Sequence, residues 1–242
     1  MVVFPGGLQA DAVIFDFDGI IVDTEPLHYK AFQEVLEPLG FGFTWQEYVN
    51  TYMGFDDRDA FIEAFAVRGK TVTPTQLHKL IDQKAGFFQH TIRDGISAYP
   101  GVVNLIKKLH NEHIPLAISS GALHSDINPI LDILGITDCF KIIISADDVS
   151  KSKPDPECYR LAFDKLVAQY PSTVISRTRS IAIEDTPAGI ASATTAGLQV
   201  VAVTNSYPWD HLTTATCIVT SLEELLDFHV FYGRHCTTLN ES

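Results

Sequence analysis

The stretch AVIFDFDGIIVDTEPLH, residues 12–28, decides the fold of this chain. It begins as an apolar, β-rich run typical of a buried strand, yet the run ends in Asp16 and Asp18. Two carboxylates about 4 Å apart repel each other by roughly 4 kcal/mol at an effective dielectric of about 20. The acidic pair therefore indicates a nearby cation or a chemical purpose at the end of this strand.

Similar short apolar runs recur along the chain, and helical patterns lie between them. Thr186, Pro187 and Gly197, for example, mark the expected N-cap, first turn and end of one such helix. Apolar runs without alternation fit a parallel sheet covered on both faces. The sequence therefore predicts an α/β fold with a Rossmann-like parallel sheet core and right-handed crossovers. The further expected strands are residues 114–120, 140–146, 179–185, 198–204 and a run near Thr216.

One long segment interrupts this alternation of strands and helices. Residues 24–95 contain helical patterns and no strand pattern, and Thr44 and Glu47 form a capping box. We therefore predict an inserted all-α helical-bundle cap domain at residues 24–95, with the α/β core domain at residues 1–23 and 96–242. Two connections to the core would let this cap open and close as a lid.

The composition argues against several classes of function. The 242 residues carry a formal net charge of −13 and are 46% hydrophobic. Such an acidic chain is not expected to bind nucleic acid or an anionic membrane surface. No apolar run approaches the ~20 residues of a membrane span, the first residues lack the basic region of a signal peptide, and the cysteines are widely spaced. We therefore expect a cytoplasmic protein, and a monomer by default.

Polar side chains follow four of the predicted strands, at the point where each strand ends. Ligands gather at the carboxyl ends of the strands in open α/β sheets. A single acid in such a place is usually an ordinary turn residue. Four strand ends that together carry acids, hydroxyls and ammonium groups instead predict an active site. These groups are Asp16 and Asp18, then Ser119, Ser120 and Gly121, then Lys151 and Lys153, and finally Glu184 and Asp185.

Four motifs give this pattern a family resemblance. In chain order they are DFDGIIVDTE, ISSGA, SKPDPE and IEDTPAGIASATTAG, and they resemble the four motifs of the haloacid dehalogenase superfamily. The resemblance covers almost the whole chain and includes an α-helical cap inserted after the first strand. It points to the β-phosphoglucomutase-like and small-metabolite phosphatase branch of that superfamily.

The resemblance implies covalent catalysis with Mg²⁺. The residue that matches the family's nucleophile is Asp16, which would attack phosphorus and become an aspartyl phosphate. Mg²⁺ would be bound by Asp16, by the backbone carbonyl of Asp18 and by Asp185, with Glu184 beside it or acting through water. Under this interpretation, the metal offsets the charge of Asp16.

The resemblance also implies the remaining roles in the core. Asp18 would protonate the leaving oxygen and then deprotonate the attacking water. Ser119, together with Ser120, Gly121 and nearby backbone N–H groups, would hold the phosphoryl oxygens. Lys153 would pair with the phosphoryl group and with the nucleophile. Taken alone, this lysine would be an ordinary solvated residue, and the surrounding motifs favour the catalytic role.

Three cap residues are expected to contact the substrate. The mutase branch carries a His, an Arg and a Lys at places comparable to His28, Arg58 and Lys84. His28 matches by its spacing from Asp16, whereas Arg58 and Lys84 match only with an insertion or a gap. The alternative for each of them is an ordinary residue on a helix surface.

Three functions are open at this point. The first is an Mg²⁺-dependent phosphohydrolase of small phosphorylated metabolites, with sugar phosphates as the expected class. The second is a β-phosphoglucomutase-like isomerase. Mutases bind a second phosphate with polar residues where this chain has Gly121, Ala122 and Leu123, so hydrolysis is favoured unless His124 compensates. The third is a non-catalytic phosphoryl-binding regulator, which usually carries a damaged motif, and no motif is damaged here.

Overall fold

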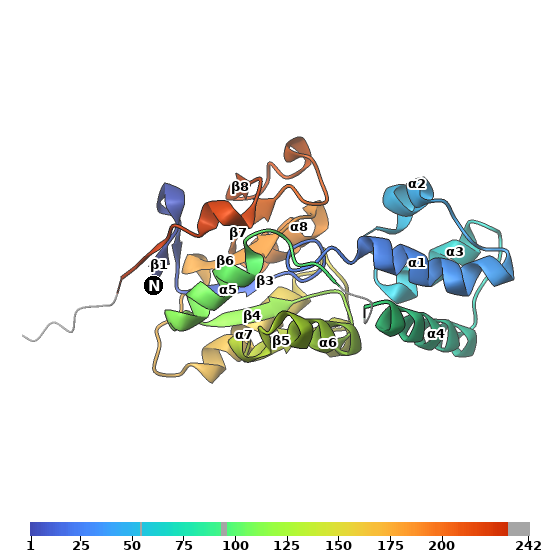
Figure 1. Ribbon diagram of the computed structural model, residues 1–242, viewed down its shortest axis with the longest axis horizontal. Helices are drawn as coiled ribbons and strands as arrows, with labels where there is room; N and C mark the ends of the chain where they lie inside the picture. The colour runs from blue at the N-terminus through green and yellow to red at the C-terminus, as the bar shows by residue number, and fades with distance from the viewer. Residues whose placement is uncertain (54, 93–95, 232–242) are drawn as a thin grey trace, which may run out of the picture.

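The computed structural model describes residues 1–53, 55–92 and 96–231. Its main sheet has six parallel strands in the order β5-β4-β3-β6-β7-β8 (Figure 1). The predicted parallel sheet is therefore confirmed, including the strand near Thr216. The strands are β3 (Ala12–Phe15), β4 (Leu116–Ser119), β5 (Ile142–Ile144), β6 (Ser180–Glu184), β7 (Gln199–Val203) and β8 (Cys217–Val219).

Four helices cover the two faces of this sheet. One face packs against α5 (Val102–Asn111) and α6 (His124–Leu134), and the other packs against α7 (Glu157–Gln169) and α8 (Pro187–Thr195). Alternate residues of β3 enter the two cores, and all four are fully buried. This double burial explains why the strands are continuously apolar. Short 3-10 helices occupy Pro5–Gly7, Glu37–Leu39, Thr137–Cys139, Ala146–Asp148, Arg177–Arg179, Trp209–His211 and Leu222–Leu225.

The helix after β6 begins and ends as its sequence predicts. The Thr186 hydroxyl accepts a hydrogen bond from the backbone N–H of Gly189, and Pro187 is the first helical residue. Gly197 follows the helix with a φ of +87°, a conformation that favours glycine. The N-cap at Thr186 places the N-terminus of α8 at the carboxyl end of the sheet.

The inserted segment is helical throughout the elements that the structure defines. Its helices are α1 (Glu25–Leu36), α2 (Trp45–Glu47), a π-helix (Tyr48–Tyr52), α3 (Asp57–Ala66) and α4 (Pro74–Ile92). They lie beyond one end of the sheet (Figure 1) and share an aromatic-rich core of their own. The predicted capping box of Thr44 and Glu47 is present, but α2 passes into the π-helix after three residues.

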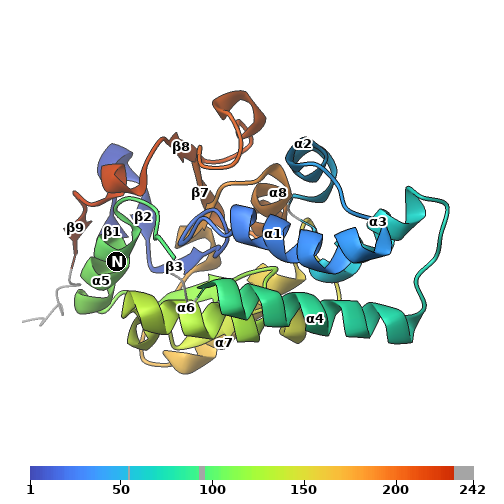
Figure 2. The ribbon, with the colours of Figure 1, turned by 45° about the vertical axis from the view of Figure 1, so that its right-hand side comes forward.

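The cap and the core meet through α4 and through the two linkers. Helix α4 packs against α6 of the core (Figure 2), and Phe88 and Ile92 of α4 belong to the core's hydrophobic cluster. Val22 and Ala98 form an isolated β-bridge that holds the two linkers side by side. Residues 93–95, at the predicted end of the cap, lie outside the described residues. The exact domain boundaries and the lid motion stay predictions.

A second, small sheet was not predicted. Three two-residue strands pair antiparallel in the order β2-β1-β9. Val2 of the middle strand pairs with Ala10 on one side and Val230 on the other. Strands this short carry no recognisable pattern, and β9 lies more than 200 residues from β1. These strands are β1 (Val2–Val3), β2 (Gln9–Ala10) and β9 (His229–Val230). Among the described residues, no helix has the length and apolarity to cross a membrane.

Candidate active site

Asp16 lies at the carboxyl end of β3. The chain adds β4 and β5 on one side of β3 and then β6, β7 and β8 on the other, so Asp16 lies where the strand order reverses. Its backbone N–H donates to the carbonyl of Ile183 in β6 at 2.9 Å, so β3 and β6 remain paired up to the site. The residue is only 7% exposed. The Nζ of Lys153 lies 2.8 Å from Asp16 Oδ1 and 2.6 Å from Glu184 Oε1. Lys153 also donates to the carbonyl of Ser119 at 3.1 Å, so one ammonium joins the ends of three strands.

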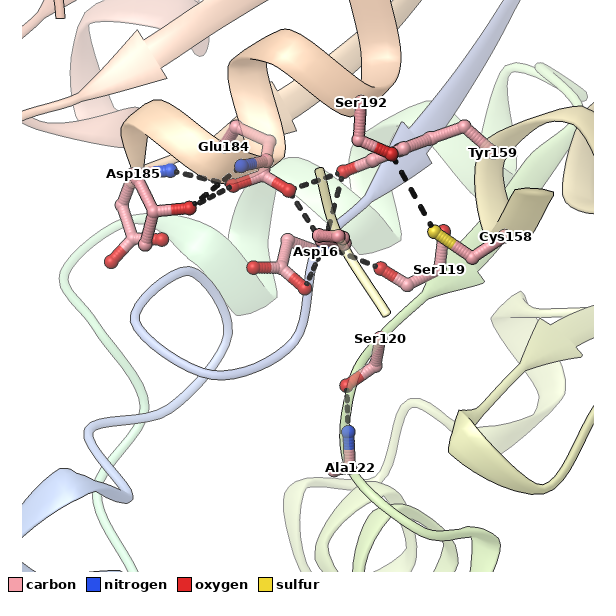
Figure 3. A network of polar contacts seen from close by, with 12 residues as sticks. Asp16, Ser119, Ser120, Ala122, Cys158, Tyr159, Glu184, Asp185 and Ser192 are labelled. Atoms are coloured by element: carbon pink, nitrogen blue, oxygen red, sulfur yellow. Dashed lines mark hydrogen bonds and ion pairs between the residues drawn. The ribbon is translucent and has the colours of Figure 1, made fainter. Parts of the chain in front are cut away.

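Glu184 is fully buried and held from several sides. The Tyr159 hydroxyl donates to Glu184 Oε1 at 2.7 Å, beside Asp16 (Figure 3). Lys153 binds the same Glu184 oxygen. Gly189 at the start of α8 is required by this contact, because a Cβ there would lie 2.0 Å from the Glu184 carboxylate oxygens. The N-terminus of α8 therefore closes directly on this carboxylate, where the helix dipole favours negative charge.

Asp185 supplies the third carboxylate and the clearest sign of a cation. The Ser206 hydroxyl donates to its Oδ2, whereas Oδ1 is buried with no hydrogen-bond partner among the described residues. Gly19 packs so closely that a Cβ there would lie 1.9 Å from Asp185 Oδ2. Asp16, Glu184 and Asp185 each offer an oxygen within 4.8 Å of the others. Hard oxygen donors and an orphaned buried oxygen fit a Mg²⁺ site.

The charges of this cluster are unbalanced. Burial, followed by repulsion from Glu184, raises the pKa of Asp16 to about 7 against the opposing effect of Lys153. Burial and repulsion from Asp16 and Glu184 raise the pKa of Asp185 well above its usual value. The carboxylates in turn keep Lys153 protonated by raising its pKa, although burial acts in the other direction. Three carboxyl groups share one ammonium, so the cluster can accept a further cation.

Asp18 belongs to a different set of partners. The Thr24 hydroxyl donates to Asp18 Oδ1, and His28 Nε2 lies 3.6 Å from the same oxygen. Thr24 is the N-cap residue of α1 but makes no capping bond through its side chain, because that hydroxyl is directed to Asp18. Burial alone raises the pKa of Asp18, but the contacts with His28 and Thr24 outweigh it and hold the pKa below its usual value.

Lys84 of the cap contacts the ring nitrogen of His28 that does not face Asp18. Its Nζ lies 2.6 Å from His28 Nδ1 and 2.6 Å from Asp57 Oδ1, and the side chain is fully buried. The rings of Phe32 and Phe88 flank the ammonium at 4.9 and 5.2 Å. The contacts therefore run from Asp57 through Lys84 and His28 to Asp18.

A cavity of about 700 Å³ separates the cap from the strand ends. Of the predicted cap residues, His28 and Arg58 line this cavity, whereas Lys84 does not. Gly121 also lines it, and with Ser120 and Lys153 it lines a smaller adjoining hollow of about 20 Å³.

Two predicted phosphate contacts are placed differently. The Ser119 hydroxyl is buried without a partner among the described residues and lines neither hollow. Only its carbonyl joins the cluster, through Lys153, so its role with phosphate stays a prediction. His124, considered as a second phosphate ligand, does not line the cavity and instead pairs with Asp148 at 2.8 Å.

Several residues of the site had escaped the sequence reasoning. Ser206 follows β7, so extending the strand-end rule to a fifth strand would have found it. Lys84 was predicted as a substrate contact, but its spacing of four from Leu80 and from Phe88 marks a buried helix stripe, which agrees with its supporting place behind His28. No local signal distinguishes the remaining ones, which are Thr24, Asp57, Asp126 and Tyr159.

Comparisons with known proteins agree with this architecture. Residues 13–203 match the family model for the haloacid dehalogenase-like hydrolases. The fructose-1-phosphate phosphatase YqaB of Escherichia coli is 28% identical over 79% of this chain and 95% of its own length. The β-phosphoglucomutase of Bacillus subtilis is 29% identical over 81% of this chain and 84% of its own length. CbbY of Rhodobacter sphaeroides, solved in complex with xylulose-1,5-bisphosphate, is 24% identical, with a TM-score of 0.80 over 90% of this chain and 96% of its own.

Proposed function

This chain belongs to the haloacid dehalogenase-like hydrolases, and within that family we propose that it hydrolyses phosphate monoesters of small metabolites. One observation carries the proposal: a buried acid, Asp16, lies 2.8 Å from the Lys153 ammonium and beside the orphaned oxygen of Asp185. The relatives named as a fructose-1-phosphate phosphatase and a β-phosphoglucomutase support sugar phosphates as the substrate class.

The residues that would hold Mg²⁺ are Asp16, Asp185 and the backbone carbonyl of Asp18, with Glu184 close by. The donor set fits this ion because its side chains are carboxylates and because Asp185 Oδ1 has no protein partner in the described chain. When bound, Mg²⁺ offsets the repulsion between a carboxylate nucleophile and an anionic phosphate.

In the first step, an oxygen of Asp16 attacks phosphorus and the bond to the ester oxygen breaks. Lys153 orients the attacking carboxylate and pairs with charge on the phosphoryl group. Asp18 gives its proton to the leaving oxygen, so the alcohol departs neutral and Asp16 becomes an acyl phosphate. A phosphate dianion entering beside Asp18 raises the pKa of that acid, which favours the protonated form that this step needs.

In the second step, water attacks the phosphorus of the acyl phosphate. Asp18, now a carboxylate, takes the proton from that water, and the bond between phosphorus and Asp16 breaks. Inorganic phosphate leaves and both acids return to their starting states. His28 and Thr24 hold Asp18 at the edge of the cavity during both steps.

An isomerase of the mutase type is the second candidate. Arg58 lines the cavity and forms no ion pair within the described residues, so it could hold a second phosphate. Hydrolysis is favoured because Ala122 and Leu123 line the cavity without contributing charge, and because Lys84 is already paired with Asp57. A mutase must bind a bisphosphate in two orientations, which one guanidinium supports poorly.

The test is release of inorganic phosphate from a panel of phosphorylated metabolites, with Mg²⁺ and with a chelator. We expect Mg²⁺-dependent release by the wild type and background release by Asp16→Asn, with folding of the variant checked by circular dichroism. A wild-type rate in Asp16→Asn would remove this residue as nucleophile. Little release, together with activation by a sugar bisphosphate and an isomerised product, would favour the mutase.

A further inference from the structure

Asp126 is a buried acid that the reaction described above does not use. It is the third residue of α6, on the core side of the cavity, and its residue is only 2% exposed. The Ser125 hydroxyl donates to its Oδ1 at 3.3 Å. Its Oδ2 is not among the fully buried oxygens without a partner in the described chain, as Asp57 Oδ2 and Asp185 Oδ1 are, and Asp126 lines the cavity. A carboxylate in such a place is costly unless a ligand or an ion pair satisfies it.

Charge balance within the protein does not explain this acid. His28 and Asp57 line the same cavity as Asp126, and α4, which carries Lys84, packs against α6. Burial raises the pKa of Asp126 to about 6, while Lys84 and His28 lower it and Asp57 raises it. Lys84 is the nearby cation, but it already has Asp57 at 2.6 Å and His28 at 2.6 Å. Asp126 forms no ion pair of its own among the described residues. A partner from outside the chain is therefore the better explanation.

The rest of the cavity wall indicates what that partner is. The volume of about 700 Å³ is far more than one phosphate needs. Phe32, Met53 and Phe55 give the wall apolar surface, and its carboxyl groups outnumber its two full cations, Arg58 and Lys153. Apolar surface with scattered acceptors suits a molecule that has C–H faces and hydroxyl donors. A second phosphate would meet net negative charge.

Building on the phosphatase function, we propose that Asp126 determines specificity by accepting a hydrogen bond from a hydroxyl of the leaving alcohol. The substrate class is then the monophosphate of a polyhydroxylated small molecule. The same carboxylate repels a second phosphate, so bisphosphates are poor substrates. Asp126 touches the part of the substrate that is not transferred and takes no part in the bond changes at phosphorus.

The first test compares two kinds of leaving group. Asp126→Ala should lower kcat/KM for fructose-1-phosphate about 10- to 100-fold, the range for one hydrogen bond to a charged group. Turnover of para-nitrophenyl phosphate, which has no hydroxyl to offer, should stay within about twofold. Asp132 is an exposed acid on the same helix, so Asp132→Asn is the matched control and should change kcat/KM for neither substrate. An equal loss on both substrates in Asp126→Ala would indicate a structural role and overturn the proposal.

The second test concerns charge. In Asp126→Asn, kcat/KM for xylulose-1,5-bisphosphate relative to fructose-1-phosphate should rise about tenfold, because a nearby negative charge is removed while an acceptor oxygen remains. An unchanged ratio would contradict the proposal. A wild-type preference for phosphoethanolamine over fructose-1-phosphate would also overturn it, because the acids would then bind a cation.

A binding measurement separates this proposal from the phosphatase function. If no ester is hydrolysed, the phosphatase function fails, but calorimetric titration of Asp16→Asn with the same probes still tests Asp126. Fructose-1-phosphate should bind about tenfold more weakly to Asp16→Asn/Asp126→Ala than to Asp16→Asn. Equal affinity in the two proteins would overturn the role of Asp126 whatever the activity.

Discussion

Two lysines with little exposed surface, one in the core and one in the cap, have different charge environments. Lys153 lies between Asp16 and Glu184, with Asp185 within reach of both acids. Lys84 has one carboxylate partner, Asp57, and its other contact is a ring nitrogen. The core assembly therefore has surplus negative charge, whereas the cap assembly pairs one ammonium with one carboxylate.

This contrast separates the chemistry from its positioning. The surplus in the core creates an affinity for a cation and for phosphate, and it leaves Asp16 with a pKa of about 7 while no metal is bound. The cap assembly pairs its one ammonium with one carboxylate and holds His28 against Asp18, although Asp57 Oδ2 is buried without a hydrogen-bond partner among the described residues. We infer that the core supplies the reaction and that the cap supplies the orientation of its acid–base group.

The largest effect is expected from removing the core ammonium. Lys153→Met leaves Asp16 and Glu184 as buried neighbours without a cation, so turnover should fall at least about 10³-fold. The free energy of unfolding should fall by about 3 kcal/mol. Phosphate release and urea unfolding measure the two effects. Lys141→Met is the matched control, because Lys141 is exposed and lies at the amino end of β5, opposite the site, so this variant should leave both quantities unchanged.

A smaller effect on turnover is expected from the cap lysine. Lys84→Met leaves the partly buried Asp57 unpaired, so the free energy of unfolding should fall by up to about 3 kcal/mol. Turnover should fall only about 10- to 100-fold, because Asp18 loses its orientation but remains present. The exposed Lys79 on the same helix gives the control, Lys79→Met.

A double variant sharpens the same contrast. Lys84→Met/Asp57→Asn removes both charges of the balanced pair, so part of the lost stability should return. No return of stability, or a loss of turnover in Lys84→Met as large as that in Lys153→Met, would show that the two assemblies do not differ in the way described.

The smallest effect is a pH dependence confined to the core. Burial first, and Glu184 next, raise the pKa of Asp16 from 3.8 to about 7, so between these values the folded protein holds a proton that the unfolded chain has lost. Stability and Tm of the metal-free protein should therefore fall as pH rises through this window. Mg²⁺ affinity should rise over the same window, because the ion competes with the proton.

Thermal unfolding with a chelator, measured across this pH range, tests the stability change. Asp16→Asn is the control, because the amide does not titrate, and its Tm should change less with pH. A Tm of the metal-free wild type that rises steadily with pH through the window would contradict the surplus of negative charge.

The same contrast explains what the sequence could predict. Asp16, Glu184 and Asp185 follow buried strands directly, and parallel strands bring their carboxyl ends to one edge, so their meeting was predictable. Lys84 and His28 lie on two different helices and are 56 residues apart in sequence. Helix periodicity shows only which face of each helix is buried. Which residues meet across those buried faces depends on tertiary packing.

The fold shows the same difference between elements with a local sequence pattern and elements that depend on distant partners. The six-stranded sheet and the inserted helices were predicted because each strand and helix carries its own hydrophobic pattern. The small sheet was not, because Val2 pairs with Val230 across almost the whole chain and two-residue strands have no pattern. Tyr159 and Thr24 likewise show their roles only when their partners, Glu184 and Asp18, are seen in space.

The central claim is that surplus negative charge at the strand ends binds a divalent cation. Isothermal titration calorimetry of the metal-free protein with Mg²⁺ tests this claim most directly. We expect one ion per chain for the wild type and for Lys84→Met, and no measurable binding for Asp185→Asn. Equal Mg²⁺ affinity in the wild type and Asp185→Asn would contradict the claim.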